Sequence, residues 1–391
     1  MYFERNIYSD LLKHLTNKQI TVLTGMRRTG KTTLLKQLMA ETESDNKIFL
    51  DLERLDNRDL FASKNYENII LALKQKGINP EEKIYIFLDE IQLVPNIPSV
   101  IKYLFDNYEI KFVITGSSSY YLKNMFTESL AGRKKIFELK TLSFYEFLKF
   151  KGINVEKTGF PFTKLSSFEY EQLNAHYFEY VEYGGFPEVV LSELKEEKLD
   201  LLNDIINSYI YIDLKSLTDI KNIENVKKLL KLLSVRIGSK LIITKIASLT
   251  QLSRETVNNY LQFLEDTYII KRIDVFSSNP DREITKTQKL YFTDNGIVKV
   301  FGSNNSGSQF ENSIFNQLSF YGIPKYYARK DGKEIDFLLN EFAFEVKESP
   351  DEYDLKNLKR ISEKIGIKNT SLIGKHKMDN FQDYIWGGSI F

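Results

Sequence analysis

The sequence contains no cysteine, almost no net charge and no long apolar run. The absence of cysteine excludes disulfide bonds, thiolate metal sites and a cysteine nucleophile, and it fits a reducing compartment. Because 54 basic residues stand against 53 acidic ones, the whole chain has no charge excess typical of a general nucleic-acid or membrane binder. No apolar run approaches the ~20 residues that span a bilayer, and the charged N-terminal residues do not resemble a signal peptide. We therefore expect a cytoplasmic protein with no membrane partner.

A phosphate-binding motif stands near the beginning of the chain. Residues 25–32 read GMRRTGKT and directly follow the apolar stretch Ile20–Leu23. A glycine-containing turn between a strand and a helix lets successive backbone N–H groups face a phosphate at the helix N-terminus. In this pattern Lys31 reaches the β- and γ-phosphates, and the Thr32 hydroxyl coordinates Mg²⁺. The expected nucleotide-binding residues are Gly25, Arg27, Arg28, Thr29, Gly30, Lys31, Thr32 and Thr33.

Two acidic residues end a second apolar strand. Residues 84–88 are all apolar, as in central parallel strands that are buried on both faces, and Asp89 and Glu90 follow them. Open α/β sheets bind their ligands at the carboxyl ends of such strands. We expect Asp89 to hold Mg²⁺ through water and Glu90 to orient and deprotonate the attacking water. The adjacent acids therefore predict ATP hydrolysis and not binding alone.

Two further polar residues are candidates for catalysis at the phosphates. A third strand at 112–115 leads to Ser117, which can bond the γ-phosphate or the lytic water, or can cap the next helix in an ordinary Gly-Ser turn. Arg133 stands before a last strand at 134–139 and can stabilise γ-phosphate charge from the same chain or from a neighbouring subunit. A surface ion pair with a nearby acid explains Arg133 equally well.

The order of these motifs resembles a prokaryotic family of predicted AAA-superfamily P-loop ATPases, of the archaeal and signal-transduction (STAND-like) type. The resemblance covers nearly the whole chain and rests on GMRRTGKT, IYIFLDEIQ, FVITGSSS, LAGRKKIFEL and LSFYEFL. It implies ATP and Mg²⁺ as cofactors and a C-terminal part of unknown function. It also implies a helical lid in which Pro187, within the GGFPE element at 184–188, lies against the adenine. The alternative for this element is a helix-breaking turn. Met26 and Thr141 stand where proline is frequent in the family, and neither departure removes a ligand group.

The region 220–300 is predicted to be a winged helix-turn-helix. A short amphipathic helix at 243–250 precedes Ser253, which can cap a second helix, and a strand follows at 268–273. Residues 221–290 carry 13 Lys/Arg and 7 Asp/Glu, a local excess that fits contact with a DNA backbone. The residues expected on the outward face and in the wing are Arg254, Asn258, Gln262, Arg282 and Lys286. A protein-contact or regulatory module is the alternative, since acidic residues flank this face.

The C-terminal region follows a Gly/Ser/Asn-rich stretch at 302–308, which has the composition of a linker. A helix over 309–320, which carries Glu311, is expected to follow it. A two-residue turn at 340–341 would put Asp336 opposite Glu345 on one face of a hairpin. Like charges directly opposite each other are destabilising, and a divalent cation between them removes the repulsion. Lys347 would then orient a water for attack on a phosphodiester, and Glu311 from the preceding helix would complete the site.

This Asp…Glu-x-Lys hairpin resembles the restriction-endonuclease-like fold, as found in Holliday-junction resolvases. The resemblance implies a nuclease site formed by Glu311, Asp336, Glu345 and Lys347, with a metal ion at the two hairpin acids. A three-residue turn would instead place these acids on opposite faces. A fold that binds without cleaving is a second alternative.

The predicted fold class is α/β, in four regions. They are a P-loop ATPase core with a parallel sheet (1–143), a helical lid (144–219), the winged helix-turn-helix (220–300) and an α/β restriction-endonuclease-like domain (309–391). We expect an ATPase whose nucleotide state controls DNA binding and the nuclease-like domain. The alternative is an ATP-driven regulatory switch whose non-catalytic C-terminal domain binds a protein partner. The sequence does not decide between a monomer and a homo-oligomer.

Overall fold

The chain folds into two compact units, which the computed structural model describes between residues 3 and 390 except 64, 117–129, 131, 158, 163–166, 214–222, 278–286, 303–304 and 330. The first unit is Met1–Lys140 with Asp266–Tyr268, and the second is Thr141–Glu265 with Ile269–Phe391. Apart from Asp266–Tyr268, the three regions predicted after residue 143 thus belong to the second unit. Among the described residues, no helix is long and apolar enough to cross a membrane. The predicted residues Ser117, Arg282 and Lys286 lie outside the described residues.

The first unit is built on a parallel sheet of five strands in the order β2-β3-β4-β1-β5. The strands are β1 (Ile20–Thr24), β2 (Lys47–Asp51), β3 (Ile84–Asp89), β4 (Ile110–Thr115) and β5 (Lys134–Glu138). The helices are α1 (Tyr8–Leu15), α2 (Lys31–Glu41), α3 (Leu55–Phe61), α4 (Glu67–Gln75), the short η1 (Ile91–Leu93) and α5 (Ile97–Asn107). The parallel sheet confirms the α/β class predicted for this region.

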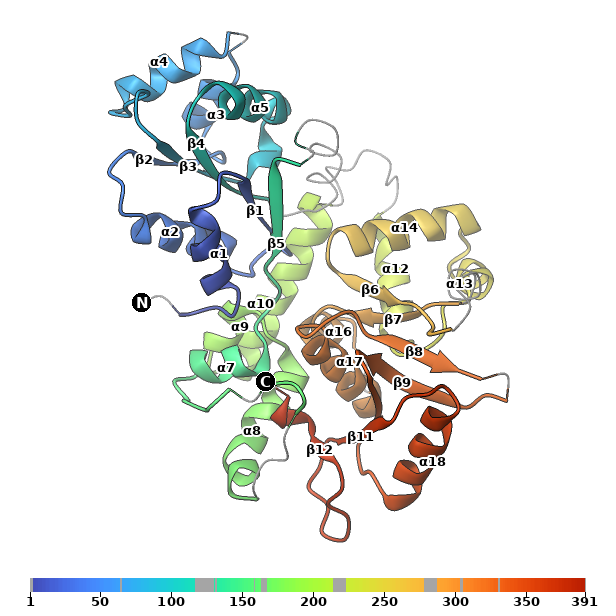
Figure 1. Ribbon diagram of the computed structural model, residues 1–391. Coiled ribbons are helices and arrows are strands. Elements are labelled where there is room, and N and C mark those ends of the chain that lie inside the picture. Colours follow the sequence, from blue (N-terminus) through green and yellow to red (C-terminus); the bar gives the residue numbers. More distant parts are fainter. Residues whose placement is uncertain are drawn as a thin grey trace. The chain divides into compact units, whose positions relative to one another are not determined.

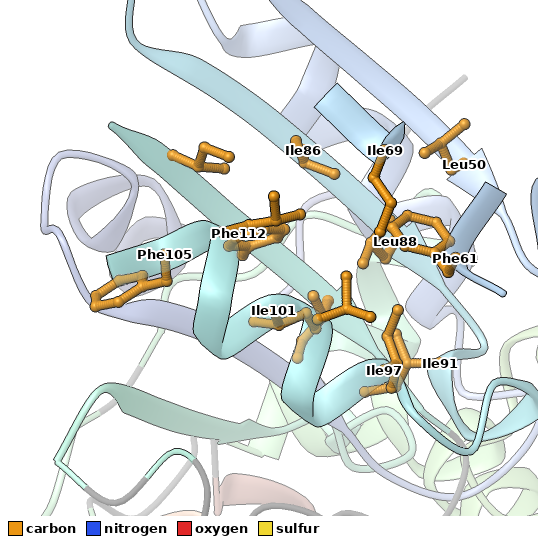
Figure 2. Packing of buried hydrophobic residues seen from close by; sticks show 14 of the residues in the cluster. Leu50, Phe61, Ile69, Ile86, Leu88, Ile91, Ile97, Ile101, Phe105 and Phe112 are labelled. Atoms are coloured by element: carbon orange, nitrogen blue, oxygen red, sulfur yellow. The ribbon is translucent and has the colours of Figure 1, made fainter. Parts of the chain in front are cut away.

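Helices cover both faces of this sheet, with α3, α4 and α5 on one face and α1 and α2 on the other (Figure 1). Figure 2 shows Ile97 and Ile101 of α5 and Phe61 at the end of α3 packed near Leu88 of β3. Every residue of β1 and β4 is buried. Strands covered on both faces consist mainly of apolar side chains. The buried polar residues of these two strands are Thr21, Thr24, Lys111 and Thr115.

The second unit begins with helices and continues into a mixed region. Its first elements are α7 (Phe144–Phe150), α8 (Ser167–Tyr183), α9 (Pro187–Leu191), α10 (Lys195–Ser208) and the π-helical turn η2 (Tyr209–Asp213). They are followed by α12 (Ile223–Ser234), α13 (Ile243–Thr250), α14 (Arg254–Asp266), β6 (Ile270–Ile273), β7 (Lys289–Phe292) and α16 (Asn295–Val300). β6 and β7 pair antiparallel. Ser253 Oγ accepts the Thr256 N–H at 3.0 Å, which confirms the predicted cap of the second helix.

The chain ends in a five-stranded sheet with the order β12-β11-β10-β9-β8. Its elements are α17 (Ser306–Leu318), β8 (Lys325–Ala328), β9 (Glu334–Leu339), β10 (Phe342–Lys347), α18 (Glu352–Glu363), β11 (Asn369–Gly374), β12 (Ile385–Trp386) and η3 (Gly387–Ser389). β9 and β10 are antiparallel, with Phe342 opposite Leu339 and Phe344 opposite Phe337. This register confirms the predicted two-residue turn, in which Asn340 takes φ +54°.

The predicted linker is wrong at its C-terminal end. Helix α17 already begins at Ser306, three residues earlier than expected. The Asn305 side chain accepts the Ser308 N–H at 3.0 Å and so caps the helix. Small polar residues favour both linkers and helix N-termini, so composition did not distinguish the two.

Candidate functional site

The segment between β1 and α2 forms a tight loop around a buried ammonium group. Gly25 has φ +140°, and a Cβ there would lie 2.2 Å from the Leu139 carbonyl oxygen, so only glycine fits at this position. Lys31 Nζ donates to the carbonyl oxygens of Gly25 at 3.0 Å and Met26 at 2.8 Å. Thr29 Oγ1 donates to the same Met26 oxygen at 2.9 Å. The loop therefore holds its lysine at the start of α2, where unpaired backbone N–H groups favour an anion.

The other predicted residues of the phosphate loop lie close to Lys31 in the sequence. Gly30 precedes α2 with φ +94°, and Thr32 is half-buried in the first turn of the helix. Arg28 is exposed and takes φ +63°, while Arg27 is half-buried and Thr33 is exposed. Thr32 thus lies at the N-terminus of α2, directly after the buried Lys31.

The predicted acids lie at the carboxyl end of β3, on the edge of the sheet from which the loop also leaves. Asp89 is buried, and its Oδ1 accepts the hydroxyl of Thr115. The Glu90 N–H donates to the same threonine oxygen at 3.3 Å. Glu90 has φ +54°, a strained conformation that is enriched at functional sites, and its Oε2 accepts from Gln92 Nε2. The two acids are therefore held by side chains that the prediction did not include.

Thr115 is one of two residues of the candidate site in this unit that the sequence prediction did not include. Strand β4 lies between β1 and β3, with Thr115 opposite Leu23 and Ile114 opposite Leu88. The last residue of β4 is thus placed between the loop strand and the acids. A signal was present, because this threonine is polar, ends an apolar strand and precedes Gly116. The sequence pattern favours Ser117, two residues later, instead.

A second missed residue is Arg5, whose guanidinium braces the loop. It is buried and donates to the carbonyl oxygens of Thr29 at 2.8 Å and Lys140 at 2.7 Å. The contact joins the phosphate loop to the chain that follows β5. No local pattern around residue 5 indicates this role, because both partners are remote in sequence.

Arg133 lies at the opposite edge of the sheet from the phosphate loop. Its carbonyl oxygen accepts the Ile20 N–H at 2.8 Å, at the beginning of β1, whereas the loop follows the end of that strand. Its guanidinium forms a two-point ion pair with Asp106 at 3.0 and 3.2 Å. This is the surface ion pair that the sequence left open as the alternative, and it does not place Arg133 at the phosphates of its own chain. The role in a neighbouring subunit stays a prediction.

The glycines of the GGFPE element are explained by packing within the second unit. The buried Asp294 carboxylate accepts the N–H groups of Gly185 at 2.8 Å and Gly296 at 2.7 Å. Gly184 has φ +77°, and a Cβ on it would lie 1.9 Å from Asp294 Oδ1. Burial raises the pKa of Asp294 to about 6. Pro187 is the first residue of α9, a position that suits proline, and its contact with adenine stays a prediction.

The second unit brings together the four residues of the predicted nuclease-like site. Asp336 Oδ2 accepts the Val346 N–H at 2.9 Å, and Glu345 Oε1 pairs with Lys347 Nζ at 2.9 Å. Glu311 of α17 accepts the Tyr291 hydroxyl at 2.7 Å. Burial, followed by the negative charge of Asp336, raises the pKa of both Glu311 and Glu345. Two segments that are far apart in sequence thus form one acidic cluster.

A buried lysine compensates part of this negative charge. Lys289 of β7 pairs with Glu334 at 3.1 Å and with Asp336 at 3.8 Å. Burial opposes its charge, yet the neighbouring carboxylates raise its pKa overall. Sequence reasoning missed Lys289, which is one of many lysines in the chain. Within the described ranges, no three His, Cys, Asp or Glu side chains are grouped so that they could hold a metal ion.

Comparison with known proteins assigns the chain to a family. Residues 17–148 match the AAA domain, and residues 174–307 match a domain of unknown function, DUF8612. The chain is 31% identical over 384 residues to the uncharacterized protein MJ1544 of Methanocaldococcus jannaschii. The aligned part covers 92% of this chain and 82% of that protein. The chain belongs to the MJ1544 family. The first unit of this MJ1544-family protein is a P-loop ATPase domain of the AAA type.

Two other proteins align with most of this chain. An uncharacterized protein of Haemophilus influenzae is 27% identical over 399 residues, covering 96% of this chain and 94% of that protein. Among solved structures, the Walker-type ATPase Paby2304 of Pyrococcus abyssi aligns with a TM-score of 0.49 and 15% identity, over 77% of this chain and 96% of that one. The assignment of the first unit rests on the AAA domain match together with the loop geometry.

Proposed function

We propose that this MJ1544-family protein hydrolyses ATP with Mg²⁺ in its first unit, and that the nucleotide state controls DNA binding and a nuclease-like site in its second unit. The ATPase proposal rests on one observation. The phosphate loop lies at the same edge of the sheet as Asp89, Glu90 and Thr115. Parallel α/β sheets bind ligands at this edge.

The side chains present at the loop suit a magnesium nucleotide. Lys31 would exchange its two backbone carbonyl partners for phosphate oxygens. The hydroxyl of Thr32 and the carboxylate of Asp89 are hard oxygen ligands of the kind that Mg²⁺ prefers. Glu90, oriented by Gln92, would take the proton of the attacking water. The bound metal ion would neutralise charge that develops on the transferred phosphoryl group.

Hydrolysis is tested by the substitution Glu90→Gln. The variant keeps the size of the side chain but removes the base, so we expect ATP binding to persist while phosphate release falls by ~100-fold or more. Glu53→Gln is the matched control, because Glu53 is an exposed acid of the same unit. Equal rates for Glu90→Gln and the control would overturn the role of Glu90.

The DNA proposal concerns the second unit. We propose that 220–300 is a winged helix-turn-helix and that the C-terminal sheet is a restriction-endonuclease-like domain. Support comes from the three helices followed by an antiparallel strand pair, and from the exposed positions of Arg254, Asn258 and Gln262 on α14. Further support is the acidic cluster of Glu311, Asp336 and Glu345 beside Lys347.

Two experiments test the DNA proposal. The ATPase rate is measured with single-stranded, duplex and branched DNA, and we expect one form to raise it. Nicking of supercoiled plasmid is measured with Mg²⁺, and we expect the double variant Asp336→Asn, Glu345→Gln to abolish it. The control Glu363→Gln changes an exposed acid on α18. Cleavage that survives the double substitution would exclude the hairpin as the catalytic site.

A second candidate function is a regulatory switch without cleavage. The observation that favours it is that lysines already stand beside the hairpin acids, Lys289 at Asp336 and Lys347 at Glu345. Such a partly neutralised cluster suits a surface that binds a protein partner. Small-angle scattering would then show a large ATP-dependent change of shape, and the ATPase rate would be the same on every form of DNA.

A further inference from the structure

A cavity of about 430 Å³ lies within the second unit, between the turn after α12, the start of α13 and strand β9. Its volume falls within the range of small-ligand sites. The charged residues that line it are Arg236, Lys240, Lys245 and Glu334. Ser239, Lys240 and Lys245 are exposed, so the cavity opens at the surface.

The lining carries more positive charge than negative. Its one carboxylate, Glu334, contacts Lys240 and also pairs with the buried Lys289 at 3.1 Å. Arg236 donates to the Leu232 carbonyl oxygen at 3.1 Å and forms no ion pair with any residue that the structure describes. Lys245 likewise has no ion-pair partner in the described part of the chain. Arg236 and Lys245 therefore line the cavity with no ion-pair partner among the described residues.

The cavity adjoins the acidic cluster directly. Glu334 lines the cavity and stands two residues before Asp336 on β9, and Lys289 contacts both carboxylates. Gly238 also lines the cavity, and a Cβ on it would lie 2.4 Å from Glu311 Oε1. The same glycine thus separates the cavity from the third carboxylate of the cluster. A strand that enters the cluster would pass the two free cations.

We propose that Arg236 and Lys245 bind a backbone phosphate of a DNA strand and so hold the neighbouring phosphodiester at the acidic cluster. The inference rests on the proposed DNA function of the second unit and adds a binding site next to it. Its chemistry is that of phosphate recognition, in which arginine offers a fork of N–H donors and lysine a mobile point charge. The cluster alone would repel a phosphate, because its carboxylates are negative. Cations at its side would offset that repulsion.

The test is fluorescence anisotropy with a fluorescein-labelled DNA duplex that carries a single-stranded tail. The double variant Arg236→Gln, Lys245→Gln is compared with Lys359→Gln, Lys364→Gln, which removes two exposed charges from α18 and its C-terminal end, outside the basic region 221–290. Two lost phosphate contacts predict an apparent Kd that is roughly 10- to 50-fold higher at ~0.1 M salt, and a slope of log Kd against log salt that falls by about 2. The control pair is expected to change both values far less. Thermal melting of all variants checks that the fold is kept.

Each outcome distinguishes the inference from the function on which it rests. A wild-type chain that binds no DNA overturns both the proposed function and this site. Wild-type binding with equal Kd and slope for the two double variants overturns only the site. A titration with inorganic phosphate alone separates the two sources of phosphate. If phosphate binds at Arg236 and Lys245 while their loss leaves DNA affinity unchanged, the site is a free-anion site and the DNA assignment is wrong.

Discussion

The hydroxyl of Thr115 offers a sharp test of how the ATPase site is organised. Valine has nearly the same shape as threonine, so Thr115→Val removes the hydroxyl from a fully buried position without leaving a cavity. The change deletes the bond donated to Asp89 and the acceptor of the Glu90 N–H. A hydrogen bond to a charged group contributes roughly 1.5–3 kcal/mol. If about 2 kcal/mol of this is lost in the transition state, the rate falls by about 30-fold.

The assay separates catalysis from binding. Phosphate release at saturating ATP gives kcat, and titration with a fluorescent ATP analogue gives the Kd. We expect kcat of Thr115→Val to fall by about 30-fold, while the Kd stays within a factor of about 3, because the hydroxyl holds the acids and not the phosphate loop. Thr115→Ser is the matched control, since it keeps the hydroxyl and loses only a methyl group. Equal kcat values for the valine and serine variants would refute the reasoning.

Four further predictions concern affinity and stability. Lys31→Ala is expected to weaken ATP binding by ~100-fold or more in equilibrium dialysis, because the phosphate loop loses its one ammonium group. Since the folded pKa of Asp294 is raised to about 6, this group should lower the free energy of unfolding from denaturant titration by up to ~3 kcal/mol as the pH rises from about 4 to about 6 and above; Asp294→Asn should reduce the measured fall by that amount, while the part due to Glu311 and Glu345 persists. Burial and a neighbouring carboxylate raise the pKa of Glu345, so Glu345→Gln should stabilise the metal-free protein by roughly 2 kcal/mol at alkaline pH, with no gain at acidic pH. In the same titration, Gly184→Ala should lower the free energy of unfolding by at least ~2 kcal/mol more than Gly152→Ala. Both glycines have positive φ, but of the two only Gly184 has no room for a Cβ. Equal losses of stability would show that the contact with Asp294 does not matter.

The sequence predicts those features that depend on residues close together in the chain. The phosphate loop, the acids after β3 and the cap of α14 depend on residues within a few positions of one another. The β9–β10 register also followed, because a two-residue turn determines which side chains share a face. The parallel sheet was expected for a similar reason, since strands buried on both faces are mainly apolar. Sequence alone therefore determined the ATPase core and the pairing of the hairpin.

Contacts between remote segments were decided only by the tertiary structure. Thr115 became part of the site because β4 inserts between β1 and β3, an order that no local pattern encodes. Arg133 faced Asp106 because its position lies at the beginning of β5 and not at its end. Lys289 pairs with two carboxylates that are more than 40 residues away in the sequence, Glu334 and Asp336. Strand order and packing are set by the burial of the whole chain, so the charges around each site follow from the fold and not from the neighbouring sequence.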